Sequence, residues 1–227
     1  MRVSAIIPAA GIGKRFHRDL PKQFLTINDK PILAYTLQRV HACEKIDAIY
    51  LVVPEDKIRH CEKEVVGKEG FPKVKKVIAG GRERQDSVYH GIRELDQGVD
   101  IVVIHDGVRP FVDPKMFSDV IDEAEKYGAA ITAIPEIDTV KKVSAEGTVE
   151  ETLDRESVWR VQTPQAFQYD IIKKAFEEAF QDHYYGTDDS SLVERAGYRV
   201  KVIPGKPSNI KITTPEDLEF GRKFLGV

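Results

Sequence analysis

The stretch AIIPAAGIGKRFHRDLPKQ, residues 5–23, begins as an apolar β-type run, breaks at Pro8 and then becomes small and basic. Residues with little or no side chain let backbone N–H groups approach a ligand closely, and successive N–H groups form an anion-binding concavity. Arg15 and Lys22 could clamp a polyphosphate from both flanks, although a surface loop with solvated charges is the alternative. The small residues are Ala9, Ala10, Gly11 and Gly13.

Two better-known glycine loops are excluded here. A Walker A loop would need glycine at Pro8 and Ser or Thr at Arg15. A dinucleotide fingerprint that starts at Gly11 would need glycine at Phe16. The loop therefore predicts a nucleotide site of another kind.

Length, net charge and cysteine content exclude several classes of protein. The 227 residues are 41% hydrophobic, which suits one α/β domain, residues 1–227, with a sizeable core. A net charge of −3 argues against nucleic-acid or membrane-surface binding as a general function. Two scattered thiols, Cys43 and Cys61, fit a reducing cytosol, and no apolar run reaches the roughly 20 residues of a membrane span. We expect a cytoplasmic protein without membrane or nucleic-acid partners.

Apolar runs alternate with segments of helical period along most of the chain. Continuous apolar runs are typical of strands buried on both faces, and their alternation with helices predicts an α/β fold with a mainly parallel sheet. The expected strands are residues 3–7, 48–53, 74–79, 101–104, 129–134, 199–203 and 209–212. The expected helices are residues 31–41, 55–66, 87–95, 114–127, 170–180, 188–196 and a last one capped by Thr214.

Three loops fall at the same edge of this predicted sheet. Ligands in such sheets bind beyond the carboxyl ends of the strands. The small-residue loop, the pair Gly80-Gly81 and Asp106 all follow predicted strands directly. Their convergence favours a binding site at that edge.

Residues 136–155 break the alternation. They show no helical period and contain a turn signal, Glu146-Gly147, between polar β-type segments, so we expect a protruding β-hairpin arm. A lone two-stranded hairpin is only marginally stable in water. Docking on a second subunit is therefore the favoured interpretation, with a mobile flap as the alternative.

Four side chains outside the loop could carry chemistry. Asp106 ends an apolar strand and could hold Mg²⁺, a hard cation that prefers oxygen ligands, or could cap a turn. Ser87 could contact a base or ribose, or cap a helix. Lys211 lies in an otherwise apolar segment and must find an anion or reach out to solvent. Arg155 could be a phosphate clamp or a solvated charge.

Several motifs along the chain together resemble those of one known family. IPAAGIGKRF…PKQF, GGRERQDSV, IHDGVRP, DTVK, LDR…WRVQTPQ, GTDDSS and NIKIT, which span Ile6 to Thr214, together resemble the 2-C-methyl-D-erythritol 4-phosphate cytidylyltransferases of the non-mevalonate isoprenoid pathway. The resemblance implies a Rossmann-like nucleotidyltransferase fold, a three-layer α/β sandwich. It also implies a homodimer in which the β-arm completes the partner's active site.

The same resemblance assigns roles to particular residues. The implied catalytic residues are Arg15, Lys22, Arg155 and Lys211. The implied nucleotide-binding residues are Ala9, Ala10, Gly11, Gly13, Arg15, Lys22, Gly81, Ser87, Asp106 and Lys211, with Asp106 near Mg²⁺. The implied substrate-binding residues are Asp106, Arg109, Thr139, Arg155, Thr163, Thr187 and Lys211. The chain departs from some members at Arg82, where they carry an acid, which puts a base contact by that side chain in doubt.

The residues and the resemblance agree on one reaction. The substrate's phosphate would attack the α-phosphorus of CTP in line and release pyrophosphate, with positioning and charge neutralisation as the enzyme's task. The substrate is expected to be 2-C-methyl-D-erythritol 4-phosphate. A cytidylyltransferase for ribitol 5-phosphate or another polyol phosphate is the first alternative. A nucleotide-binding regulatory module without turnover is the second.

Overall fold

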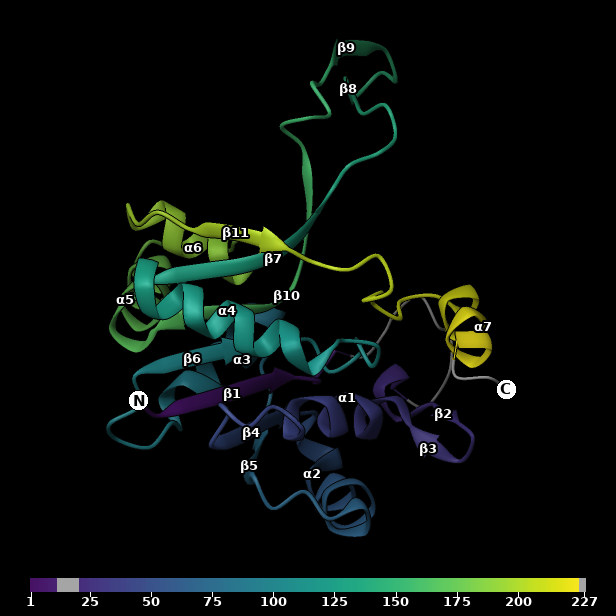
Figure 1. Ribbon diagram of the computed structural model, residues 1–227, viewed down its shortest axis with the longest axis vertical. Coiled ribbons are helices and arrows are strands. Elements are labelled where there is room, and N and C mark those ends of the chain that lie inside the picture. Colours follow the sequence, from purple (N-terminus) through teal and green to yellow (C-terminus); the bar gives the residue numbers. More distant parts are fainter. Residues whose placement is uncertain (12–20, 225–227) are drawn as a thin grey trace.

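The computed structural model describes residues 1–11 and 21–224 (Figure 1). Its main sheet has seven strands in the order β11-β7-β10-β6-β1-β4-β5. The strands are β1 (Val3–Pro8), β4 (Ala48–Val53), β5 (Val74–Ala79), β6 (Ile101–Ile104), β7 (Ala129–Pro135), β10 (Trp159–Gln168) and β11 (Lys201–Pro204). Every pairing is parallel except the two made by β10. The predicted mainly parallel sheet is confirmed.

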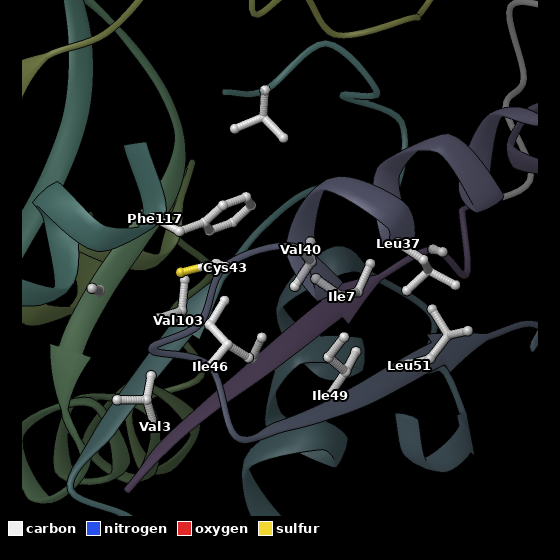
Figure 2. Packing of buried hydrophobic residues seen from close by; sticks show 14 of the residues in the cluster. Val3, Ile7, Leu37, Val40, Cys43, Ile46, Ile49, Leu51, Val103 and Phe117 are labelled. Carbon is white, nitrogen blue, oxygen red and sulfur yellow. The ribbon is translucent and has the colours of Figure 1, made fainter. Parts of the chain in front are cut away.

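Helices cover both faces of this sheet and give three layers. Side chains of β1 alternate between two cores, with Ala5 and Ile7 in one and Ile6 in the other. The first core packs under α1 (Ile32–His41) and α4 (Pro114–Tyr127), and Figure 2 shows Leu37 and Phe117 of these helices around the strands. The second core packs under α3 (Arg84–Arg93), α5 (Tyr169–Gln181) and α6 (Asp189–Arg195). The α/β sandwich expected from the resemblance is therefore present.

A smaller apolar cluster lies beside the carboxyl ends of the strands. It joins the short hairpin β2 (Thr26–Ile27) and β3 (Lys30–Pro31) to α7 (Pro215–Phe224). Its buried members are Leu25, Ile27, Ile32, Val108, Phe111, Ile212 and Leu218. The Ile212 N–H donates to the carbonyl of Val108 at 2.9 Å, which fixes the segment that carries Lys211 next to the loop after β6.

The predicted arm is present. Strands β8 (Lys141–Val143) and β9 (Val149–Thr152) form a separate two-stranded sheet that projects from the body (Figure 1). Its base continues the main sheet, because Trp159 of β10 pairs with Pro135 of β7. Large apolar side chains are exposed on the arm and its base: Ile137, Val143, Val149, Trp159 and Val161.

The sequence did not predict β10, and it wrongly predicted a strand at residues 209–212. Strand β10 contains Pro164 and a run of polar residues, so it lacks the apolar pattern of a central strand; its register with β7 shifts between Val161 and Gln165, around the proline. Residues 209–212 form no strand: the Asn209 N–H makes a turn bond to the Lys206 carbonyl, and the Ile212 N–H bonds to the Val108 carbonyl.

Two helix starts also differ from the prediction. Helix α3 begins at Arg84, because Glu83 caps it and Asp86 returns the bond to the Glu83 N–H. Helix α5 begins at Tyr169, so Asp170 lies inside its first turn. The remaining helical segments before α3 are η2 (Lys22–Phe24), η3 (Glu55–Lys57), α2 (Ile58–His60) and the π-helical η4 (Cys61–Gly67). Over residues 1–11 and 21–224, none of the helices has the length and apolar character needed to cross a membrane.

Candidate active site

A cavity of about 760 Å³ opens at the carboxyl ends of β1, β5 and β6. It brings together eight of the predicted site residues: Ala9, Ala10, Gly11, Lys22, Gly81, Ser87, Asp106 and Lys211. It is also lined by Pro8, Gln23, Arg82, Glu83, Arg84 and Val108. The expected convergence of three loops on one edge is confirmed.

The start of the small-residue loop is held at both backbone groups of Ala9. The Ala9 N–H donates to the Val52 carbonyl at 2.7 Å, so this N–H belongs to the sheet and is not available to a ligand. The buried Gln23 donates its side-chain Nε2–H to the Ala9 carbonyl at 2.5 Å, which draws the two ends of the loop together. Gly13 and Arg15, both predicted site residues, lie outside the residues that the structure describes.

Gly80 allows the loop after β5 to touch the small-residue loop. A Cβ at Gly80 would lie 2.1 Å from the Cβ of Ala10 and 3.0 Å from Oγ of Ser87. No side chain fits at such distances without a shift of the backbone. The close approach of these two loops therefore requires glycine at this position.

We expect Gly80→Ala to lower the free energy of unfolding by about 1–3 kcal/mol, the usual cost of overpacking. Urea denaturation measures this loss. Adding Ala10→Gly removes the opposing methyl group and should recover most of the stability. If the double variant is as unstable as Gly80→Ala alone, the clash with Ala10 is not the cause.

The hydroxyl of Ser87 is occupied by the protein. It accepts from the Gly81 N–H at 3.1 Å and donates to the Glu83 carbonyl at 3.1 Å. Ser87 lies in the first turn of α3 rather than at its cap. Its hydroxyl therefore shapes the Gly81 loop that lines the cavity.

Asp106 is the centre of a cluster of positive charge. Its Oδ1 accepts from Nε of Arg84 at 3.0 Å, its Oδ2 lies 2.8 Å from Nζ of Lys211, and Nε of Arg109 lies 3.6 Å from the same Oδ2. Burial alone would raise the pKa of Asp106, but Arg84, Lys211 and Arg109 hold it well below its usual value. The carboxylate is ionised, and it is the anion that Lys211 was expected to find.

Sequence reasoning missed Arg84 and Asp189. Arg84 donates from Nη1 and Nη2 to the two carboxylate oxygens of Asp189, at 2.9 and 2.7 Å, while its Nε holds Asp106. Asp189 is only 1% exposed, so this bidentate pair compensates a buried charge. Both residues lie within the recognised motifs GGRERQDSV and GTDDSS, but nothing in the sequence indicated that they pair with each other.

A chain of hydrogen bonds fixes the loop after β6. The Asp106 N–H donates to Oγ1 of Thr163 at 3.1 Å, and that oxygen lies 3.0 Å from Nδ1 of the fully buried His105. Nε2 of His105 lies 3.2 Å from the Arg109 carbonyl, which can only accept. His105 therefore donates from Nε2 and accepts the Thr163 hydroxyl proton at Nδ1. Thr163, a predicted substrate residue, thus holds the backbone of Asp106 in place through the Asp106 N–H.

Burial lowers the pKa of His105 to about 3. Because the unfolded state binds a proton near pH 6.5 and the folded state does not, this group's stabilisation is complete above pH 6.5 and is lost as the pH falls toward 3. From pH 7.5 to 4.5 the loss in the free energy of unfolding is about 3 kcal/mol, because roughly 1.4 kcal/mol is lost for each pH unit below 6.5. Urea denaturation at both pH values should show this loss in the unmodified protein, and His105→Gln should lack it. Equal losses in both proteins would contradict the burial of a neutral imidazole.

The remaining predicted residues lie outside the main cavity. Thr187 lines a second cavity of about 590 Å³, which shares Arg82 and Arg84 with the first. Thr139 and Arg155 are exposed on the arm, where Nη1 of Arg155 donates to the Ile137 carbonyl at 3.5 Å. The described part of the chain does not bring Thr139 and Arg155 to Asp106.

The donor set around Asp106 suits a metal held mainly by phosphates. Among residues 1–11 and 21–224, no group of three or more His, Cys, Asp or Glu side chains could hold a metal ion. Mg²⁺ often binds proteins through one or two carboxylates together with substrate phosphates and water. Asp106 is ionised, lines the cavity and keeps lone-pair capacity beyond its contacts to Arg84 and Lys211, so it fits this mode as a single ligand.

Comparisons with known proteins agree over the whole chain. The family model described as IspD, 2-C-methyl-D-erythritol 4-phosphate cytidylyltransferase, matches residues 3–226. Proteins of that same description from Syntrophus aciditrophicus and Geotalea uraniireducens are 50% and 47% identical over 224 and 227 residues, covering 99% of this chain and 96% and 97% of theirs. The crystal structure of 4-diphosphocytidyl-2C-methyl-D-erythritol synthase from Anaerococcus prevotii superposes with a TM-score of 0.89 at 35% identity, covering 100% of this chain and 96% of that one. The chain therefore belongs to the 2-C-methyl-D-erythritol 4-phosphate cytidylyltransferase family.

Proposed function

We propose that this protein transfers the cytidylyl group of CTP to 2-C-methyl-D-erythritol 4-phosphate, giving 4-diphosphocytidyl-2-C-methyl-D-erythritol and pyrophosphate. The family and the relatives' names support the reaction. The observation that carries it in the structure is the charge cluster of Arg84, Asp106, Arg109 and Lys211 at a cavity made by the small-residue loop.

The chemistry needs no general base from the protein. A phosphate monoester has a second pKa near 6, so it is already a nucleophilic dianion near neutral pH. Its oxygen bonds to the α-phosphorus of CTP while the bond from that phosphorus to the bridging oxygen breaks and pyrophosphate leaves. His105, the histidine beside Asp106, is neutral, buried and hydrogen-bonded on both nitrogens, which agrees with a mechanism without a histidine base.

Positioned positive charge is then the main catalytic contribution. Lys22 and Lys211 line the cavity and would neutralise charge that builds on the α-phosphate and the leaving group. The N–H groups of Ala10 and Gly11 would bind the CTP phosphates, since within the described residues no hydrogen bond uses them. Arg15 is proposed to act with Lys22 from the other flank of the loop.

We propose Mg²⁺ as the cofactor, held by Asp106 together with phosphate oxygens. When bound, it would neutralise charge on the triphosphate. The low pKa of Asp106 keeps this ligand ionised throughout the working pH range. Lys211 pairs with the same carboxylate and lines the same cavity, so it would act on the same triphosphate.

The substrate side is proposed to use Arg109 and Thr187 from one chain, with Thr163 acting through its bond to the Asp106 N–H. Nε of Arg109 is buried and, within the described residues, makes no hydrogen bond. Such a donor is costly to leave unsatisfied, so an anionic substrate next to Asp106 would relieve it. Thr139 and Arg155 are proposed to reach the site of the other subunit through a homodimer made by the arm.

The exposed apolar side chains on the arm support this dimer. Ile137 is 72% exposed and Val149 55% exposed, which is unfavourable on a hairpin that has no core of its own. The mass in solution at assay concentrations tests the proposal. A dimeric mass that Ile137→Asp converts to a monomer supports it, whereas a monomeric mass for the unmodified protein overturns both the arm dimer and the role of Arg155 across it.

Pyrophosphate release from CTP and Mg²⁺ across a panel of polyol phosphates tests the function. The proposal expects the highest kcat/KM with 2-C-methyl-D-erythritol 4-phosphate. A preference for ribitol 5-phosphate would overturn the substrate assignment but keep the reaction. If no polyol phosphate gives pyrophosphate release while CTP still binds, a regulatory module is favoured.

A further inference from the structure

A segment without regular structure, residues 184–187, connects α5 to α6 and lies against the first turn of α3. It carries Thr187, which lines the second cavity, and it ends at Asp188, the N-cap of α6. The side chains of Tyr184 and Tyr185 are only partly exposed: Tyr184 lies under Arg195, and the Tyr185 hydroxyl donates to Oδ1 of Asp86 at 2.9 Å. These contacts hold the two tyrosines, and the backbone on either side of Thr187 is held separately.

One buried carboxamide holds this segment by its backbone. Nε2 of Gln85 donates to the Tyr184 carbonyl at 2.9 Å, and Oε1 of Gln85 accepts from the Gly186 N–H at 2.9 Å. The amide thus pairs with the segment as a neighbouring strand would. Gln85 is only 7% exposed, so water competes poorly for these two bonds.

Other contacts limit where the segment can lie. A Cβ at Gly186 would lie 2.3 Å from Oγ of Ser191, so the chain passes directly against α6. The side chain of Asp188 accepts from the Ser191 N–H at 3.0 Å. Thr187 is therefore fixed on one side by the bond from Gly186 to Gln85 and on the other by the helix cap.

Arg84, the residue before Gln85, contacts Asp106 in the main cavity. Arg84 holds the carboxylate of Asp106, and Gln85 holds the segment that bears Thr187. Two adjacent side chains at the start of α3 thus set the spacing between Asp106 and Thr187. Asp106 and Thr187 are both substrate contacts under the proposed function, on which this inference rests.

We propose that Gln85 is a positioning residue for the polyol phosphate, which it serves by placing Thr187 relative to Asp106. Gln85 does not line the main cavity, among whose walls Ala10, Gly11 and Lys22 are proposed to bind CTP. Loss of its amide therefore weakens the polyol phosphate and spares the nucleotide. A purely structural role would instead affect both substrates alike.

The test compares Gln85→Met, which keeps the length but removes both bonds, with the matched change Gln97→Met at an exposed glutamine. In steady-state kinetics, Gln85→Met should raise KM for the polyol phosphate at least fivefold and change KM for CTP less than twofold. Gln97→Met should leave both KM values within twofold of the unmodified protein. Equal rises in both KM values, or no rise in either, overturn the positioning role.

Two further measurements keep this result distinct from folding and from the proposed function. If Gln85→Met does not fold by circular dichroism, Gln85→Asn replaces it, because the shorter amide cannot reach both backbone groups and should give the same selective rise. Turnover by the unmodified protein is measured in parallel. Absence of that turnover refutes the proposed function, whereas turnover without the selective change refutes the role of Gln85 alone.

Discussion

Alanine at Lys22 or at Lys211 is expected to slow the chemical step at least about 100-fold, as loss of one positioned donor to a developing anion typically does. Both side chains line the cavity, and Lys211 is held 2.8 Å from Asp106. Single-turnover measurement with saturating CTP and Mg²⁺ isolates this step from substrate binding. Lys173→Ala, on the exposed surface of α5, is the matched control and should stay within twofold.

A loss under tenfold in either variant would rule out that lysine as a stabiliser of the transition state. The two lysines also differ in a way that the experiment can show. Removal of Lys211 takes away one of the cations around Asp106, whereas Lys22 belongs to η2. Urea denaturation of both variants separates structural side effects from the loss of rate.

The second large effect concerns stability. Arg84→Met should lower the free energy of unfolding by about 3–5 kcal/mol, because it leaves the carboxylate of Asp189 buried without its cation. Arg84 itself is about one-third exposed, which places the expected value toward the lower end. Denaturation in urea near pH 7 provides the measurement.

A double variant shows whether the unpaired charge is the cause. Asp189→Leu added to Arg84→Met replaces the ion pair by apolar side chains, which often restores the stability of a buried pair. Recovery of most of the loss is expected. A double variant that is less stable than Arg84→Met, or a single variant that loses under about 1 kcal/mol, would show that Asp189 does not depend on Arg84.

The strands that the sequence predicted correctly are mostly continuous apolar runs. Strands such as β4 and β6 are continuous apolar runs that end at Pro54 or at the polar pair after Ile104, so composition alone marks them. Strand β10 has no such pattern. Its buried Gln162, Thr163 and Gln165 are satisfied by partners far away in the sequence, which a local pattern cannot reveal.

The site shows the same division between local and distant information. Asp106 and Lys211 could be chosen because each stands out against apolar neighbours. Arg84 and Asp189 do not stand out, since charged or polar residues surround both in the sequence, and 105 positions separate them. The roles proposed for Thr139 and Arg155 require a second chain, so neither the sequence pattern nor the fold of one chain places them at a site.

The arm leaves the sheet at Pro135 and returns at Trp159, and these two residues are paired neighbours. The arm is therefore an insertion whose two ends lie side by side in the main sheet. Lengthening this insertion at its exposed turn, around Gly147, adds little to the entropic cost of closing the loop. It also leaves the strand register of the main sheet unchanged. A change in the length of the arm therefore leaves the pairing of the main sheet, and with it the cavity around Asp106, in place.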